Sequence, residues 1–117
     1  MQEGGISQGL IRGNIDTIVL RILCEGDTYG YEILKAVSKD SGRNYELKES
    51  SLYTSLKRLQ IQNLVSVYPG EESHGGKRKY YQVTALRKET YEKNLEEWRI
   101  AKLLIDRLIE PREKHEE

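Results

Sequence analysis

The apolar residues of this chain recur with helical spacing in three successive segments of its first half. Residues 10–23, 29–39 and 49–62 each carry apolar side chains three or four positions apart, the pattern of a helix with one buried face. Gly26 can end the first helix, and Asp27 or Thr28 can supply the oxygen that caps the second. Three short amphipathic helices in a row predict a small helical core.

Strand-like residues follow these helices. Residues 64–68 and 79–84 are rich in β-branched and aromatic side chains, and the segment 69–76 between them is strongly turn-forming. Asn63 tolerates a positive φ and can end the third helix. A further short extended piece is expected at 45–47. The sequence therefore predicts a β-hairpin with a long tip.

A final helix is predicted from a cap at Thr84 to about Glu110, where Pro111 stops it. Its length of roughly 39 Å, at about 1.5 Å per residue, exceeds what a small domain needs for its own packing. One apolar stripe consists of Tyr91, Leu95, Trp98, Ile105 and Ile109, and another side holds Ile100, Leu103 and Leu104. A helix apolar on two sides needs two neighbours, so we expect a homodimer in which the first stripe forms the interface.

The order of these elements is that of a winged helix-turn-helix. The predicted fold class is mainly α with a small β-hairpin, followed by one long C-terminal dimerisation helix. We expect a DNA-binding domain over residues 1–84, with its N-terminal helix also at the dimer interface. The dimerisation helix is expected over 85–110 and a disordered tail over 111–117.

The third helix is predicted to enter the major groove of double-stranded DNA, because that groove admits a helix and presents a distinct pattern for each base pair. The predicted hairpin is the wing of this fold. It would hold a phosphate strand of the DNA, because Gly76 lets the two backbones approach closely and three cations follow it. The candidate DNA-binding residues are Ser50, Ser51, Tyr53, Thr54 and Lys57 on the helix, and Gly76, Lys77, Arg78 and Lys79 on the wing.

The single tryptophan, Trp98, lies in the middle of the predicted dimer stripe. It serves either as a packing anchor between subunits or, with its copy across the twofold axis, as a sandwich for a planar aromatic ligand. The candidate ligand-binding residues are Trp98, Leu95, Lys102, Asp16 and Leu10.

Signals of an enzyme are lacking. His74 and His115 fall in a loop and in the tail, no His and Cys residues have metal-ligand spacing, and no glycine-rich phosphate loop occurs. We therefore expect no catalysis, no cofactor and no metal. Cys24 is expected to be a buried structural thiol. Without a signal peptide or a membrane-spanning segment, we expect a cytoplasmic protein that does not bind membranes.

Four segments in the same order resemble the PadR family of transcriptional regulators, over about residues 10 to 108. They are Leu10-Ile-Arg-Gly13, Tyr29-Gly-Tyr-Glu-Ile33, Ser51-Leu-Tyr-Thr-Ser-Leu-Lys-Arg-Leu59 and Gly75-Gly-Lys-Arg-Lys-Tyr-Tyr-Gln-Val-Thr84. The single long C-terminal helix with its tryptophan is similar to the short subgroup that includes multidrug-sensing repressors.

The resemblance implies a dimer on a palindromic operator, with Tyr53, Thr54 and Lys57 facing DNA and Gly76, Lys77 and Arg78 forming the wing contact. It also implies a planar aromatic compound between paired tryptophans at the position of Trp98. Asn63 and Arg87 replace common glycines, and Lys102 stands where a drug-binding relative has an acid, which argues against cationic ligands unless Asp16 compensates.

The leading hypothesis is thus a repressor that a small aromatic ligand releases from a pseudo-palindromic operator. A constitutive DNA-binding regulator without a ligand, and a winged-helix module that binds proteins only, remain alternatives.

Overall fold

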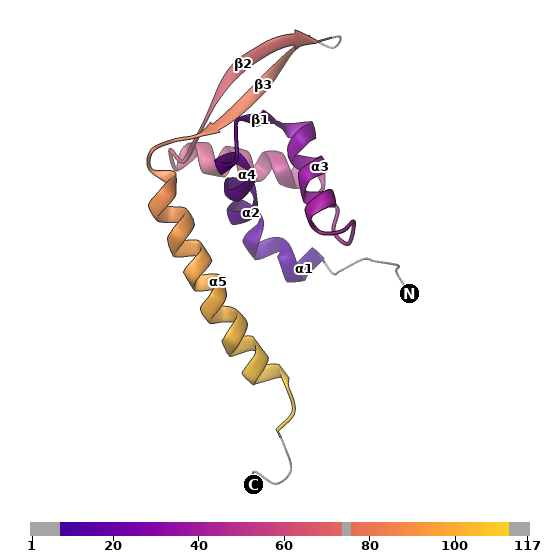
Figure 1. Cartoon of the computed structure of the whole chain (residues 1–117), viewed down its shortest axis with the longest axis vertical. Helices are drawn as coiled ribbons and strands as arrows, with labels where there is room; N and C mark the ends of the chain where they lie inside the picture. Colours follow the sequence, from indigo (N-terminus) through magenta and orange to yellow (C-terminus); the bar gives the residue numbers. More distant parts are fainter. Residues whose placement is uncertain (1–7, 74–75, 113–117) are drawn as a thin grey trace.

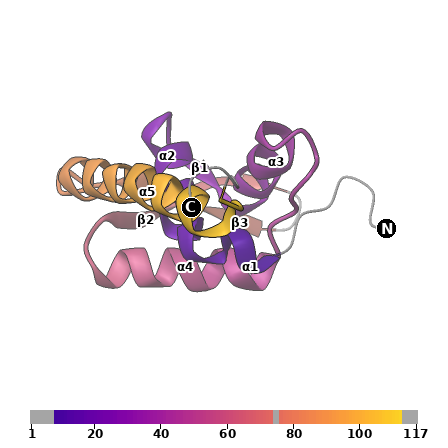
Figure 2. The same cartoon turned by 90° about the horizontal axis from the view of Figure 1, so that it is seen from below.

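The structure, a computed structural model, describes residues 8–73 and 76–112. Its helices are α1 (Gln8–Ile11), a 3-10 turn (Arg12–Asn14), α2 (Ile15–Cys24), α3 (Gly30–Asp40), α4 (Glu49–Ile61) and α5 (Arg87–Ile109). Its strands are β1 (Thr28–Tyr29), β2 (Val65–Ser73) and β3 (Gly76–Val83). The hairpin projects above the cluster of α1 to α4, which we call the head, and α5 runs away from the head on the side opposite α3 (Figures 1 and 2).

The predicted helices are present, with two corrections at their ends. The first is not one helix over 10–23, because the backbone tightens into a 3-10 turn where Gly13 and Asn14 disfavour α-helix. The last begins at Arg87 rather than directly after a cap at Thr84, whose hydroxyl donates to the carbonyl oxygen of Asn63 at 2.7 Å and accepts from the Leu86 N–H at 3.3 Å. The prediction for Asn63 is confirmed, since it ends the turn after α4 with a φ of 63°.

The hairpin gains a third strand that the sequence did not predict. The sheet is antiparallel with the order β1-β3-β2, and Thr28 and Tyr29 pair with Tyr81 and Tyr80. The prediction that Asp27 or Thr28 caps the second helix is wrong, because α3 begins at Gly30 without any side-chain cap. Two residues are too few to give a strand pattern in sequence, so the pairing arises from the long-range approach of β3.

The strands of the hairpin also extend much further than predicted. Pro69 lies within β2 and pairs with Lys79, although the turn was expected to begin there. β2 is an edge strand, where a missing N–H is tolerated, and the register shifts between Pro69 and Glu72 as a bulge. The wing is therefore a long two-stranded arm.

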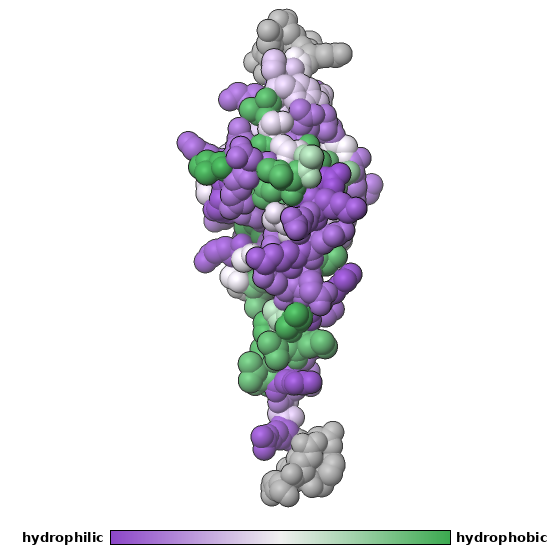
Figure 3. Space-filling model, turned by 90° about the vertical axis from the view of Figure 1, so that its left-hand side faces the viewer, coloured by the Kyte–Doolittle hydropathy of each residue, from purple (hydrophilic) through white to green (hydrophobic). Residues whose placement is uncertain are grey.

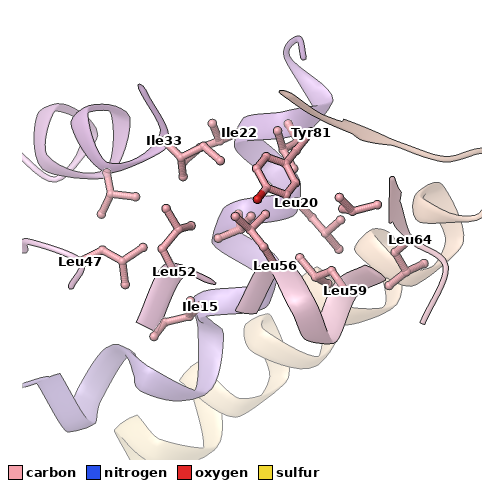
Figure 4. Close-up of a cluster of buried hydrophobic side chains, with 14 of the residues drawn as sticks. Ile15, Leu20, Ile22, Ile33, Leu47, Leu52, Leu56, Leu59, Leu64 and Tyr81 are labelled. Carbon is pink, nitrogen blue, oxygen red and sulfur yellow. The ribbon is translucent and has the colours of Figure 1, made fainter. Parts of the chain in front are cut away.

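The core of the head lies where α2, α3 and α4 meet the base of the sheet (Figure 4). Leu20, Ile33 and Leu52 are completely buried there, and Tyr81 closes the core from β3. Residues 45–47, expected to be a short extended piece, lie outside the helices and strands, and Tyr45 and Leu47 are buried in the core. This packing fixes α4 relative to the wing.

The long helix α5 has no buried residue. Figure 3 shows apolar side chains gathered on its C-terminal half, below the polar surface of the head. The large exposed apolar residues of α5 are Trp98, Ile100, Leu103, Leu104, Ile105, Leu108 and Ile109. None of the described helices combines the length and apolar character needed to cross a bilayer. Cys24, expected to be buried, is exposed at the end of α2.

Candidate nucleic-acid interface

Helix α4 divides into a buried face and a solvent face. Leu52, Ser55, Leu56 and Leu59 are buried, as the apolar spacing predicted. The predicted DNA-binding residues of this helix lie on the other side, where Ser50, Tyr53, Thr54 and Lys57 are exposed and Ser51 is half-buried. Glu49, in the first turn, is the acidic residue on this helix. The solvent face therefore offers hydroxyls and an ammonium group to a partner.

A polar link fixes α4 to α2 beneath that face. The Asp16 carboxylate accepts hydrogen bonds from Arg58 at 2.7 and 2.8 Å and from the fully buried Ser55 at 2.6 Å. Burial alone would raise the pKa of Asp16, but the hydrogen bonds from Arg58 and Ser55 and the charge of Arg58 together lower it. Asp16 is thus ionised and paired, and Arg58 is held against the head.

Tyr53 does not project freely from α4. Its hydroxyl lies against Gly30, at the start of α3, so closely that a Cβ on Gly30 would overlap it. Burial raises the pKa of Tyr81, with a smaller contribution from the nearby Tyr53. The contact holds the Tyr53 ring between α4 and α3, which the spacing on α4 alone did not reveal.

Two of the predicted cations of the wing line a groove together with Tyr53. Arg78 and Lys79 are exposed on β3, and Gly76 is the first residue of that strand. The guanidinium carbon of Arg78 lies 4.2 Å from the centroid of the Tyr29 ring, a cation–π contact. The backbone of Lys77 is in β3, but its side chain lies outside the described part of the structure, so its predicted role stays a prediction.

A row of tyrosines ties the wing to β1. The ring centroids of Tyr29 and Tyr80 are 5.4 Å apart, and those of Tyr80 and Tyr68 are 5.8 Å apart. Gly70 leaves the space that Tyr80 fills, since a Cβ there would overlap its ring. The Tyr68 hydroxyl donates to Asp27 at 2.8 Å, and this hydrogen bond raises the pKa of Tyr68. The tyrosines give the base of the wing a defined direction.

A mostly apolar groove of about 340 Å³ lies between α5 and the α1–α2 region. Leu10, Leu95 and Trp98 line it, so three of the five predicted ligand-binding residues come together. Lys102 and Asp16 are not part of its lining, and Asp16 points to α4 instead. Asn14, Thr17 and Arg21 supply the polar lining.

The predicted dimer residues do not share one environment. Tyr91 packs against the core of the head and also lines the groove, so it has a neighbour within the chain. Ile105 and Ile109 are 46% and 74% exposed, and neither belongs to the core cluster or to the lining of the groove. The interface residues that remain uncovered are therefore those near the C-terminal end of α5.

Sequence reasoning missed Tyr29, Gly30 and Tyr80 as part of the candidate interface. They lie in the segment Tyr29-Gly-Tyr-Glu-Ile33 and in the strand Lys79-Tyr-Tyr-Gln-Val83, both of which were noted for other reasons. The high tyrosine content of these two segments was the available signal. Its meaning depends on the pairing of β1 with β3, which brings the rings together.

Comparison with known proteins gives the same result for the sequence and for the fold. The model of the transcriptional regulator PadR-like family matches residues 19–93. An uncharacterised protein from Lysinibacillus sphaericus is 38% identical over 105 residues, which cover 90% of this chain and 96% of that protein.

Two solved structures are similar over most of their length. A transcriptional regulator from Clostridium thermocellum is 38% identical, with a TM-score of 0.81 over 90% of this chain and 99% of that one. A PadR family transcription regulator from Clostridium difficile is also 38% identical, with a TM-score of 0.70 over 84% of this chain and 100% of that one. Because the family model matches more than half of the sequence, this chain belongs to the PadR-like family of transcriptional regulators.

Proposed function

We propose that this protein is a homodimeric repressor that acts in the cytoplasm, binds a pseudo-palindromic operator and releases it when a planar aromatic molecule binds. The observation that carries the DNA-binding part is the surface formed by α4 and β3. Thr54 and Lys57 are exposed on α4, and Arg78 and Lys79 are exposed on β3, where they line one groove together with Tyr53 of α4. In a winged helix this arrangement lets α4 read base edges in the major groove while the wing holds phosphates.

The uncovered apolar surface of α5 supports the dimer. Large apolar patches on a chain without a partner mark interaction sites, and this one continues over the last three turns of a helix. A twofold pair of α5 helices would cover it and place two copies of α4 about 34 Å apart, one turn of DNA.

The groove between α5 and the α1–α2 region supports the ligand. Its volume of about 340 Å³ falls at the lower end of the range for small-molecule sites, and its lining is mostly apolar with a few polar groups. Trp98 is 39% exposed there and offers a flat surface. A ligand can release DNA only if it binds the two dimer states with different affinity.

Footprinting on the DNA upstream of the protein's own gene tests the DNA-binding part. We expect a protected, pseudo-palindromic site, and Lys57→Ala is expected to weaken binding to it. Lys39→Ala, at the far end of α3 from the wing, is the matched control and is expected to leave binding unchanged. A wild-type protein that protects no site at low salt contradicts the proposal.

Titration of planar aromatic dyes tests the ligand part. Trp98 is the only tryptophan, so its emission reports on the groove without interference, and a ring stacked on it is expected to quench that emission. If the dye changes neither the emission nor the DNA affinity, the result supports a constitutive regulator in which Trp98 serves only as a packing anchor between subunits.

A further inference from the structure

A groove of about 560 Å³ lies between the wing, the start of α3 and α4. Its lining consists of Tyr29, Gly30, Tyr31, Tyr53, Arg78, Lys79 and Tyr81. Two of these residues are cations, four are tyrosines, and the lining includes no carboxylate. Such a composition favours an anion with hydrogen-bond acceptors, because the two cations neutralise its charge and donate hydrogen bonds to its oxygens.

Two acidic residues that neighbour this groove in the sequence, Glu32 and Asp27, already have partners. Glu32 accepts a hydrogen bond from the Tyr29 hydroxyl at 3.2 Å and pairs with Lys35 at 3.5 Å. Asp27 accepts the hydrogen bond from Tyr68. Arg78 and Lys79, in contrast, form no salt bridge with any side chain that the structure describes. Their charges are therefore free to meet an anion from outside.

The ring of Tyr29 fixes how Arg78 meets that anion. The guanidinium carbon lies over the ring, 4.2 Å from the ring centroid. An arginine stacked in this way keeps its donors for a planar or tetrahedral oxyanion, and it loses less side-chain freedom on binding. Tyr29 is in turn held by Tyr80 and by the pairing of β1 with β3.

Tyr53 forms the opposite wall of the groove. Because its hydroxyl is held against Gly30, the ring stands between α4 and α3 rather than pointing along the solvent face of α4. Tyr53 is 43% exposed, so its edge remains accessible from the groove. This placement suits contact with the sugar-phosphate backbone better than contact with a base edge.

We propose that this groove binds one backbone phosphate of the bound DNA. Arg78 contacts the phosphate, Tyr29 positions Arg78, and Tyr53 contacts the DNA backbone. The inference rests on the proposed DNA-binding function. When α4 lies in the major groove and the wing lies beside it, the strand between them must cross the space that separates α4 from β3. That space is this groove.

The test is fluorescence anisotropy with two duplexes, the footprinted operator and a scrambled sequence of equal length, over a series of salt concentrations. Arg78→Gln is expected to weaken binding to both duplexes by the same factor and to make the salt slope shallower by about 2 per dimer, one phosphate on each subunit. Lys39→Gln removes one charge at the far end of α3 and is expected to leave the slope unchanged.

Two substitutions at Tyr29 test its positioning role. Tyr29→Leu removes the ring and is expected to weaken binding to both duplexes by about 2- to 5-fold, the size of an exposed cation–π contact. Tyr29→Phe keeps the ring and is expected to bind as the wild type does, although it loses the hydrogen bond to Glu32. Equal losses in Leu and Phe variants would overturn the positioning role of the ring.

The outcomes separate this proposal from the proposed function. A wild-type protein that binds neither duplex refutes the function itself. If the wild type binds normally and Arg78→Gln changes neither the affinity nor the salt slope, only the phosphate-binding role of the groove is refuted. If Arg78→Gln or Tyr53→Phe no longer binds the operator but still binds the scrambled duplex, the residue contacts a base. That outcome also overturns the phosphate-binding role of the groove.

Discussion

Helices α4 and α5 both carry leucine and isoleucine at helical spacing, but they meet different surroundings. In α4 the apolar side chains are covered within the chain, and Leu52, Leu56 and Leu59 are at most 1% exposed. In α5 no residue is buried, and Leu103, Leu104 and Leu108 are 63%, 48% and 82% exposed. An apolar stripe thus indicates that a helix needs a neighbour, but it does not indicate whether that neighbour belongs to the same chain.

The difference between the helices follows from their position in the chain. α4 is flanked by α2, α3 and the sheet, all of which can reach its buried face. α5 is the last element, and after its first turns it extends beyond the head, where the described chain has nothing left to cover it (Figure 1). Exposing the apolar C-terminal half of α5 to water therefore costs free energy unless a partner covers it.

Matched leucine substitutions give the largest expected difference between the two helices. Leu56→Ala is expected to lower the free energy of unfolding by about 2–5 kcal/mol, because it leaves a cavity in the core. Leu104→Ala is expected to have a much smaller effect on the unfolding of the monomer, because Leu104 is half-exposed. Urea denaturation at low protein concentration measures both. Equal losses would show that α5 is packed within its own chain.

The next effect concerns the association of two chains through α5. The double variant Ile105→Ser and Ile109→Ser is expected to weaken the dimer by about 3 kcal/mol or more, roughly 100-fold in Kd, because four apolar side chains leave the proposed interface. Sedimentation equilibrium measures the change. Arg107→Ser, on the same two turns, serves as the control, and a wild-type chain that stays monomeric at micromolar concentration contradicts the dimer.

The order of helices and the hairpin was predictable from the sequence, because it depends on local spacing and on strong breakers such as Pro111. The buried face of α4 was equally predictable. β1 and the contact of Tyr53 with Gly30 were not, because both arise from segments that are distant in sequence and meet only in the folded chain.

Asp16 shows the same limit within the candidate site. It was predicted to approach the ligand groove, but Ser55 and Arg58, about forty residues later, hold it on α4. The spacing on α2 places Asp16 on a face of that helix without showing which helix packs there. A partner that lies so far along the chain could not be read from the local pattern.

The link between Asp16 and α4 predicts a pH dependence of the head that α5 does not share. The folded-state pKa of Asp16 is below its ordinary value of 3.8, so its contribution is complete above that pH and is lost as the pH falls below it. Asp16→Asn is expected to cost about 1–2 kcal/mol at neutral pH, limited by the partial exposure of Arg58. Urea midpoints of wild type and variant should converge at low pH.

The control for this experiment is Asp40→Asn. Asp40 accepts a hydrogen bond from Arg21 at 2.6 Å, but the side chain of Asp40 is more exposed than that of Asp16, at 45% against 26%. We expect this variant to cost less than about 1 kcal/mol. A wild-type and an Asp16→Asn protein that stay equally far apart down to pH 2 would show that the ionised form of Asp16 does not stabilise the head.

The smallest effect on stability is expected at Gly30, in the proposed DNA-binding groove. A Cβ there overlaps the Tyr53 hydroxyl, but Tyr53 is 43% exposed and its ring can move aside, while alanine favours the first turn of α3 by up to about 1 kcal/mol. Gly30→Ala should therefore unfold within about 1 kcal/mol of the wild type, yet bind DNA more weakly because Tyr53 is displaced. Gly13→Ala, whose Cβ meets no atom within 4 Å, is the matched control for both measurements. A Gly30→Ala protein with unchanged stability and unchanged DNA affinity would mean that the position of Tyr53 has no part in binding, and that the solvent face of α4 and the wing act independently of the groove between them.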